Sequence, residues 1–372
     1  MDETQDYFSL KKLQIELLLW ALFWVSGFLC GAILVLNDMG WETALKSSMV
    51  MLGLGGFFFV SLWKDIPLNR SVSYGMLYPT LGLANHISIF RGLLITVLAG
   101  FVFLPIDGGW LEWAPGILFL TISLLDFADG AAARFTGRFS LLGEQLDMRL
   151  DGAGVLFGSI ILIMIGKAPI YFVVVGLVRY LYVFGQFALL KTGKPVFPLP
   201  SNPYRRALAG TMMGFISITL FPIFSPVVTS VAAILFLIPF LIGFWQDWLY
   251  TSGVISPDQG IKLPVGLPYD LFPDLIRIAA GCFLIFSPAF PTDISNFSGF
   301  MFSLLTIMGL FPRVSVLGLL LFTGNLLSHQ GSDPMLWAAL VFASASFFLG
   351  GGRFAIWSPE NWLIYHRVGD ED

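Results

Sequence analysis

Apolar stretches of about 20 residues recur along almost the whole chain, and this recurrence is the strongest constraint on its fold. A stretch of that length is what an α-helix needs to cross a bilayer, where a helix satisfies its own backbone hydrogen bonds. The sequence therefore predicts an all-α, polytopic membrane protein. About twelve transmembrane helices are expected, at residues 14–36, 46–63, 86–105, 114–135, 143–166, 169–190, 206–223, 226–249, 271–290, 294–311, 313–328 and 334–352.

The composition agrees with a membrane protein. Hydrophobic residues make up 56% of the chain and charged residues 12%, whereas a soluble domain carries about twice that charged fraction. The 37 Phe and 11 Trp suit a surface that faces lipid, with aromatic belts at the two interfaces. The net charge of −4 gives no reason to expect a nucleic-acid partner, so the expected surroundings are membrane lipids.

The distribution of Lys and Arg predicts the orientation. If the N-terminus is cytoplasmic and the twelve spans alternate, sixteen of these residues fall at the inner side and only Lys46 and Lys167 at the outer side. We therefore expect a multi-pass protein with both termini in the cytoplasm, in the inner membrane if the host is bacterial. The first apolar run is too long for a signal-peptide core, so we expect it to be retained as a helix.

Loops divide the chain into four expected parts. Residues 1–63 form two N-terminal transmembrane helices, and residues 64–249 form a core of six helices that is preceded by an interfacial segment. We expect an interfacial helix within residues 64–85. Residues 250–270 are rich in Gly and Pro and are read as a linker. Residues 271–372 contain the last four spans.

Four aspartates occur where a chain this apolar would be expected to avoid charge. Asp126, Asp129, Gly130 and Ala133 are spaced at i, i+3, i+4 and i+7, which is one face of a helix. Gly143, Asp147 and Asp151 follow at i, i+4 and i+8, on one face of the next helix. The connection is short, so the two helices are expected to be antiparallel neighbours. Their aspartates then converge at the cytoplasmic ends of the two helices.

Four carboxylates in one place repel each other unless a cation lies between them. Mg²⁺ binds a few carboxylates together with the phosphates of a substrate. Two such ions would neutralise the aspartates, and Arg134 and Arg138 lie nearby in the sequence. The residues alone thus predict a metal-dependent reaction on a phosphorylated substrate at the inner leaflet.

At these residues the chain resembles a known family. The pattern Asp126-x-x-Asp129-Gly130-x-x-Ala133-Arg134, then eight residues, then Gly143-x-x-x-Asp147-x-x-x-Asp151 resembles the signature of the CDP-alcohol phosphatidyltransferases. The resemblance covers about residues 80–249, where the family's core of six helices fits. It implies a CDP-linked lipid or alcohol as substrate, two divalent ions (Mg²⁺ or Mn²⁺) in the active site, and CMP as the leaving group.

The resemblance also implies roles for individual residues. Asp126, Asp129 and Asp147 would bind the metals, and Asp151 would bind metal or lie near it and act as the general base. Asp129, Gly130, Ala133, Arg134 and Gly143 would form the nucleotide-binding part of the site. The stretch that begins with Asn85 and includes Arg91 is similar to the polar start of the family's first core helix.

The acceptor alcohol or a lipid phosphate is expected at Asn85, Arg91, Arg179, Arg205 and Arg206. Arg179 lies midway along a span, so it either serves function or pairs with a buried carboxylate. Arg205 and Arg206 either bind a phosphate or anchor the helix at the inner leaflet. Arg138 and Arg149 are read as positive-inside residues that reach the headgroups. The three histidines, His86, His329 and His366, are isolated, so we expect no catalytic role for them.

The last four spans end in the stretch LGGGRFAIWSPENW and resemble DoxX-type four-helix membrane proteins. Within them, Asp274 and Arg277 are one helical turn apart and are expected to pair. Asn325 and His329 either line a small polar site or, like that pair, hold the bundle together. The added helices leave three roles open: they stabilise the fold, mediate a homodimer or bring in a lipid.

The sequence thus predicts an enzyme of phospholipid biosynthesis. It would transfer a phosphatidyl or phospho-alcohol group from a CDP-linked donor, with CDP-diacylglycerol as the preferred choice, to an acceptor hydroxyl. The first alternative is transfer from a CDP-amino alcohol to diacylglycerol. An alternative of another class is a cation- or proton-coupled membrane transporter that uses the intramembrane acids.

Overall fold

The computed structural model describes residues 3–73, 75–106, 108–199, 203–255, 271–290, 297–330 and 333–359. Over these residues the chain is mostly α-helical, and its only β-type pairs are isolated bridges. The helices are α1 (Glu3–Met39), α2 (Trp41–Asp65), α3 (Leu83–Gly100), α4 (Ala114–Thr136), α5 (Leu141–Met164), α6 (Val174–Lys191), α7 (Pro203–Leu220), α8 (Pro226–Thr251), α9 (Phe272–Ile285), α10 (Phe297–Met308), α11 (Pro312–Gln330) and α12 (Pro334–Leu349).

Each predicted span corresponds to one of these helices, so the all-α fold of a polytopic membrane protein is confirmed. Within the part of the chain that the structure describes, six helical segments can cross a bilayer by length and composition: Asp6–Met39, Trp41–Leu68, Leu83–Phe103, Gly109–Thr136, Ile170–Lys191 and Pro226–Thr251. α5 carries several charged side chains in its first half, and α9, α10 and α12 are shorter than a full span. Twelve crossings with both termini inside therefore stay a prediction.

The chain packs as two compact units. Unit 1 contains Met1–Ile165 with Ile216–Phe221 at the end of α7, and unit 2 contains most of Gly166–Arg367. The boundary at residue 165 falls inside the core expected at residues 64–249, because α3, α4 and α5 pack among themselves, whereas α8 packs against α6, α11 and α12. Most of the expected linker, residues 256–270, lies outside the described residues. The four-part domain scheme stays a prediction.

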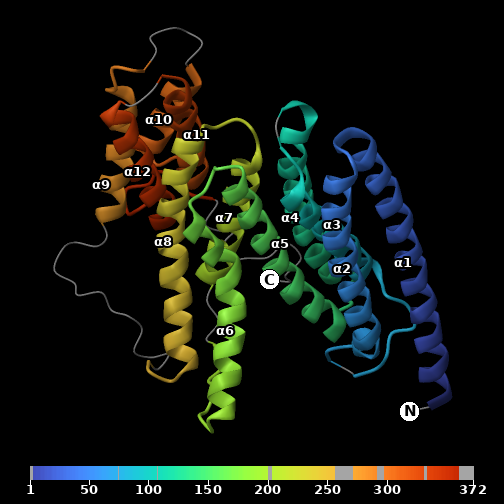
Figure 1. Cartoon of the computed structure of the whole chain (residues 1–372). Helices are drawn as coiled ribbons and strands as arrows, with labels where there is room; N and C mark the ends of the chain where they lie inside the picture. Colours follow the sequence, from blue (N-terminus) through green and yellow to red (C-terminus); the bar gives the residue numbers. More distant parts are fainter. Residues whose placement is uncertain are drawn as a thin grey trace. The chain divides into compact units, whose positions relative to one another are not determined.

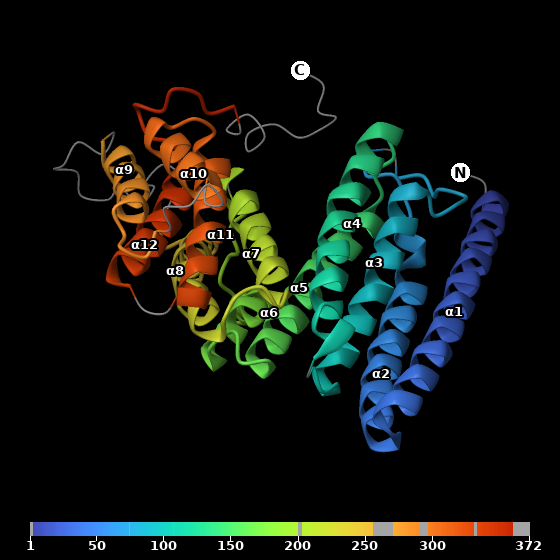
Figure 2. The same ribbon diagram turned by 90° about the horizontal axis from the view of Figure 1, so that it is seen from above.

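α3 is the central helix of unit 1. It packs against α2 on one side and against α4 and α5 on the other (Figures 1 and 2). Glycines allow the close approach on the α2 side. A Cβ added to Gly92 of α3 would lie 2.5 Å from the ring of Phe58 on α2. Trp24 of α1 lies against Gly55 in the glycine-rich part of α2, and its indole N–H donates to Thr96 Oγ1 of α3 at 3.1 Å.

A tight turn joins α4 to α5. Gly137 follows α4 with φ 61° and ψ 20°, the left-handed conformation that glycine adopts without penalty. The Gly137 N–H donates to the carbonyl of Arg134, and the Arg138 N–H donates to the carbonyl of Ala133, both at 3.1 Å. Ser140 then caps α5 by accepting from the Gly143 N–H at 3.0 Å. This turn brings the two acidic stretches close together in space.

The prediction of an interfacial helix within residues 64–85 is wrong. After α2 a single 3-10 turn (Ile66–Leu68) leads into a loop, residues 69–82, whose described part contains no α-helix. Pro67 and Pro79 interrupt helical hydrogen bonding, and Gly75 and Gly82 adopt positive φ angles. The loop instead runs beside the α4–α5 turn, where the Leu141 N–H donates to the Arg70 carbonyl at 3.1 Å.

In unit 2, α9 to α12 form a four-helix group, and α8 contacts α11 and α12. The predicted pair of Asp274 and Arg277 is confirmed, with Nη2 2.8 Å from Oδ1 and both side chains buried. Arg277 Nη1 also donates to the carbonyls of Thr306 and Ile307. Asp274 accepts from the backbone N–H of Arg353 at 2.8 Å. The pair thus ties α9 to α10 and to the Gly-rich turn after α12.

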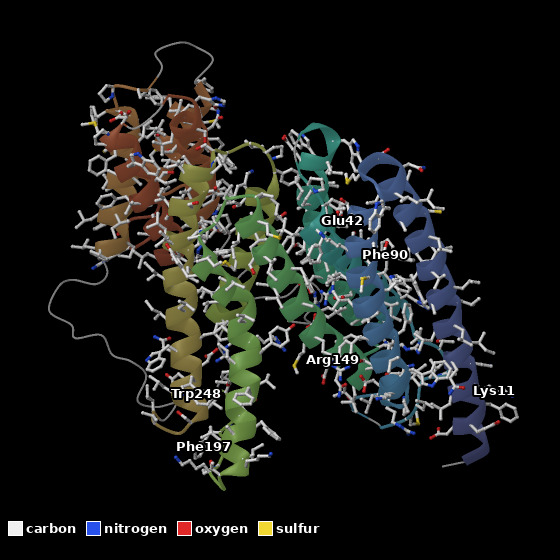
Figure 3. The ribbon with its side chains drawn as sticks, viewed as in Figure 1. Lys11, Glu42, Phe90, Arg149, Phe197 and Trp248 are labelled. Carbon is white, nitrogen blue, oxygen red and sulfur yellow. The ribbon has the colours of Figure 1, made fainter. Side chains whose placement is uncertain are left out.

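Two further points concern unit 2. Phe197 and Trp248 lie at the same end of this unit (Figure 3), where the Phe197 N–H donates to the Thr251 carbonyl at 3.1 Å. The DoxX-like character of the last four helices and the polar site at Asn325 and His329 stay predictions.

We predict that Gly137→Ala lowers the thermal midpoint of the protein in detergent. An alanine in the left-handed conformation is destabilising by about 1–2 kcal/mol. The matched control is Gly27→Ala on α1, where an added Cβ meets no atom within 4 Å and helix propensity favours Ala. Thermal unfolding followed by circular dichroism compares the two, and an unchanged midpoint in Gly137→Ala would contradict the role of this turn.

Candidate active site

The four predicted aspartates come together in unit 1. Asp126 and Asp129 lie on α4, and Asp147 and Asp151 lie on α5. One carboxylate oxygen from each of Asp126, Asp129 and Asp147 lies within 4.8 Å of the other two. Asp151 is one turn further along α5 and approaches the same guanidinium as the other three. The convergence expected from helical spacing is therefore present.

The guanidinium of Arg91 lies between these carboxylates. Its Nη1 contacts Asp126 Oδ1 and lies 3.6 Å from Asp129 Oδ2. Its Nη2 lies 3.3 Å from Asp147 Oδ1 and 3.5 Å from Asp151 Oδ1. The sequence associated Arg91 with the acceptor or a lipid phosphate, but its contacts in unit 1 are with the acidic group itself. Opposite charges at these distances attract, so the guanidinium offsets part of the repulsion among the carboxylates.

The carboxylates differ in exposure, and the difference defines an open side. The Arg91 side chain is 1% exposed and that of Asp129 is 8% exposed, whereas Asp126, Asp151 and Asp147 are 28%, 36% and 54% exposed. The buried side is formed by α3 and the open side by α5. An ion or a polar ligand can therefore reach Asp147 and Asp151 from outside while Asp129 and Arg91 remain enclosed.

Ser88 is a site residue that the sequence did not assign. Its hydroxyl donates to Asp129 Oδ2 at 2.8 Å, and both groups are buried. This hydrogen bond satisfies the carboxylate that has least contact with solvent. The signal was available, because Ser88 is three residues after Asn85 and three before Arg91, on the same side of α3.

Asn85 lies in an internal network next to the carboxylates. Its amide Nδ2 lies 3.0 Å from the Leu81 carbonyl, 3.0 Å from Asn69 Oδ1 and 3.1 Å from Ser140 Oγ. The residue is 4% exposed. A buried amide with its donors occupied by protein groups favours a scaffold role over direct contact with an acceptor. Asn85 joins the 69–82 loop, α3 and the start of α5.

The two small motif residues have different surroundings. A Cβ added to Gly143 would lie 2.9 Å from Asn85 Oδ1 and 3.2 Å from Ser140 Oγ, so this glycine accommodates neighbouring side chains. A Cβ added to Gly130 would meet only the guanidinium of Arg134, at 3.3 Å from Nη1. Ala133 and Arg134 are half-buried on the last turn of α4. The α4 surface at Gly130 therefore leaves more space beside the carboxylates than the α5 surface at Gly143.

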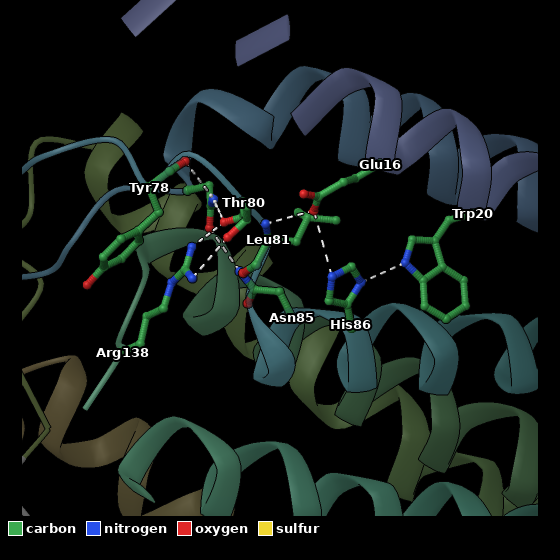
Figure 4. Close-up of polar contacts among 9 residues, drawn as sticks. Glu16, Trp20, Tyr78, Thr80, Leu81, Asn85, His86 and Arg138 are labelled. Carbon is green, nitrogen blue, oxygen red and sulfur yellow. Dashed lines mark hydrogen bonds and ion pairs between the residues drawn. The ribbon is translucent and has the colours of Figure 1, made fainter. Parts of the chain in front are cut away.

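Polar contacts from three other segments hold this end of α3 (Figure 4). Trp20 Nε1 of α1 donates to His86 Nδ1 at 2.9 Å, and His86 Nε2 lies 3.7 Å from Glu16 Oε2. Glu16 also accepts from the Leu81 N–H at 2.9 Å. These contacts give His86 a structural role.

Arg138 and Arg149 bind other groups of the protein. Arg138 donates to the carbonyl and hydroxyl of Thr80 and lies 4.3 Å from the centre of the Tyr78 ring. Burial lowers the pKa of Arg138, yet an arginine stays charged at any physiological pH. Arg149, labelled in Figure 3, pairs with Asp65 at the end of α2. Both arginines therefore fasten the loop after α2 to the α4–α5 hairpin.

The other residues predicted for the acceptor lie in unit 2. Arg179 is half-buried on α6. Arg205 on α7 forms a two-pronged ion pair with Asp247 on α8, with Nε–Oδ2 at 2.7 Å and Nη2–Oδ1 at 2.9 Å. Arg206 is on α7, but its side chain lies outside the described residues. The acceptor role of these three residues stays a prediction.

Comparison with known proteins identifies the region around the carboxylates. Residues 81–248 match the family model described as CDP-alcohol phosphatidyltransferase, a range that runs from the start of α3 to the end of α8. No curated protein and no solved structure matches the chain. The chain therefore carries a CDP-alcohol phosphatidyltransferase domain, and it is a membrane enzyme that transfers substituted phosphate groups.

We predict that Gly143→Ala destabilises unit 1, because the new methyl group would overlap Asn85 Oδ1. Overpacking of this kind is typically destabilising by about 1–3 kcal/mol. The matched control is Gly130→Ala, whose methyl group meets only the mobile end of Arg134. Thermal midpoints in detergent test this prediction. Equal midpoints for the two variants would mean that the Asn85 network does not constrain Gly143.

Proposed function

We propose that this enzyme transfers a phosphatidyl group from CDP-diacylglycerol to the hydroxyl of an acceptor alcohol and releases CMP. The observation that carries the proposal is the group of four carboxylates on α4 and α5, inside the range that matches the family. The acceptor oxygen forms a bond to the β-phosphorus, and the bond from that phosphorus to the CMP oxygen breaks. The acceptor loses its proton in the same reaction.

The carboxylates fit divalent metal ions. All donor atoms in the group are oxygens, which Mg²⁺ and Mn²⁺ prefer, and three of them are near enough to share an ion. Asp126, Asp129 and Asp147 would hold two such ions, together with Asp151. When bound, the ions would neutralise charge on the pyrophosphate and its transition state. Partial exposure of Asp147 and Asp151 gives ions and phosphates access.

Asp151 is our candidate for the general base. It is further from the three closest carboxylates, and its side chain is 36% exposed, so an acceptor hydroxyl can approach it. A base must lie within hydrogen-bond reach of the proton that it removes. Asp151 would accept the proton of the acceptor hydroxyl, while Asp126, Asp129 and Asp147 would hold the metal ions.

The nucleotide would lie along the last two turns of α4. Gly130 leaves room beside Asp129, and Ala133 adds only a methyl group on the same face. Arg134 would contact the donor through its guanidinium, which already lies over Gly130. Gly143 would act indirectly, because it lets Asn85 and Ser140 hold the start of α5.

The acceptor and the orientation are further parts of the proposal. We assign binding of the acceptor or of a lipid phosphate to Arg179, Arg205 and Arg206, with Arg205 exchanging Asp247 for the anion. We assign the reaction to the cytoplasmic face, where Lys and Arg are concentrated. A donor of the CDP-amino alcohol type with diacylglycerol as acceptor is the second candidate. The family match favours a transferase over a coupled transporter.

We expect purified protein in nanodiscs to release CMP from CDP-diacylglycerol when one alcohol of a panel is added with Mg²⁺ or Mn²⁺. EDTA should abolish the release, and excess Mg²⁺ should restore it, because the divalent ions would neutralise charge on the pyrophosphate and its transition state. Release of CMP that persists in EDTA would contradict the metal assignment. Release only with a CDP-amino alcohol and diacylglycerol would replace the first donor with the second.

We predict different defects for Asp147→Asn and Asp151→Asn. Asp147→Asn should weaken Mn²⁺ binding by at least about tenfold and stop CMP release, because a metal ligand is lost. Asp151→Asn should keep most Mn²⁺ binding but slow CMP release by about 10²–10⁴-fold, the usual contribution of a general base.

Mn²⁺ binding is measured by electron paramagnetic resonance, and CMP by chromatography. The matched control is Asp38→Asn, an exposed aspartate at the end of α1. Wild-type turnover in Asp151→Asn would remove its assignment as base.

A further inference from the structure

The guanidinium of Arg91 approaches all four carboxylates in the described part of the chain. Its side chain is 1% exposed and comes from α3, whereas the carboxylates come from α4 and α5. One guanidinium thus bridges three helices. The four carboxylates outnumber this guanidinium, so the acidic group attracts further positive charge.

The scaffold fixes Arg91 in this position. One turn earlier on α3, Ser88 donates to Asp129, and two turns earlier Asn85 is held by Asn69 and Ser140. One residue later, Gly92 packs against the Phe58 ring on the opposite side of the helix. α3 therefore can neither rotate nor slide without breaking these contacts, and its arginine points into the acidic group.

The guanidinium contacts the same three carboxylate groups that would hold a metal. Nη1 and Nη2 approach Oδ1 of Asp126, Oδ1 of Asp147 and Oδ2 of Asp129. A divalent ion bound by these three residues would lie within a few ångström of the guanidinium, and the two cations would repel each other strongly. Binding of the ion and retention of all the Arg91 contacts are therefore incompatible.

We propose that Arg91 is a resident counter-ion, which holds the four carboxylates together in the metal-free enzyme and gives them up to divalent ions. That these ions are the ones used in catalysis rests on the proposed function. Arg91 is a positioning residue in this account. It prevents the aspartates from repelling each other before metal binds, and its displaced guanidinium then lies beside the site, where its charge favours the pyrophosphate.

The test compares Arg91→Met with Arg149→Met, an arginine on the exposed side of α5 that pairs with a single aspartate. Thermal midpoints are measured in EDTA and with saturating Mn²⁺, and Mn²⁺ affinity is measured by electron paramagnetic resonance. In EDTA, Arg91→Met should lower the midpoint by several degrees more than Arg149→Met. In saturating Mn²⁺ the difference between the midpoints of the two variants should disappear, because the metal replaces the missing positive charge.

The affinity of the enzyme for Mn²⁺ is a second readout. Replacing an arginine that had only a structural role would not increase this affinity. Arg91→Met should bind Mn²⁺ about tenfold more tightly than wild type. A change of this size is typical when a cation that competes for the same carboxylates is removed. Arg91→Lys, which keeps one charge but cannot span the group, should fall between the two. Weaker Mn²⁺ binding in Arg91→Met, or an equal loss of stability with and without Mn²⁺, would overturn the proposal.

A second comparison separates this inference from the proposed function. In EDTA, the double variant Arg91→Met with Asp126→Asn should be more stable than Arg91→Met alone, because one repelling carboxylate is gone. A double variant that is no more stable overturns the counter-ion role, whatever the enzyme's activity. Wild type that fails to bind Mn²⁺ contradicts both the metal site and the exchange. Wild type that binds Mn²⁺ but releases no CMP contradicts only the proposed reaction.

Discussion

The attraction between Arg91 and four converging carboxylates is the interaction on which the rest of unit 1 depends. Four like charges at the ends of two apolar helices repel each other, and the buried Asp129 has little solvent to screen its charge. One buried guanidinium opposes this repulsion from a third helix. Removing a single partner from such a buried group is costly, because the remaining charges lose their compensation. The arrangement is therefore stable only if α3 is held firmly, and the contacts around α3 can be understood as that support.

The two N-terminal helices, to which the sequence gives no chemical role, supply part of this support. Trp20 and Glu16 of α1 hold His86, and Trp24 holds Thr96, so one face of α3 is fastened over about three turns. The other face carries Ser88 and Arg91 to the carboxylates. The arginines of the α4–α5 hairpin add a second tie, since Arg138 binds Thr80 and Arg149 binds Asp65. The extension before the family domain is thus part of the scaffold of the site.

Helix positions and the acidic motif could be predicted from the sequence, whereas the cation among the aspartates could not. Apolar length and helical spacing are local properties, so α4, α5 and the faces that carry Asp126 and Asp147 follow from residues a few positions apart. Arg91 and Asp147 are 56 positions apart, and Arg138 and Thr80 are 58 apart. No periodicity connects such residues. The loop of residues 69–82 was mistaken for an interfacial helix for the same reason, since its partners at Phe139 and Leu141 are distant in sequence.

A comparison of buried arginines shows why Arg91 suits exchange and Arg277 does not. Arg277 pairs with one buried aspartate and donates to two backbone carbonyls of α10, and Asp274 in turn accepts backbone N–H groups after α12. Each partner is enclosed or belongs to the main chain, so nothing from outside can replace it, and the pair acts as a brace. Around Arg91, by contrast, Asp147 and Asp151 are open to solvent on the side away from α3. An incoming cation can take these oxygens first and draw the others afterwards. A buried arginine thus forms a permanent ion pair where its partners are enclosed, as at Arg277. It forms an exchangeable ion pair where its partners are accessible, as at Arg91.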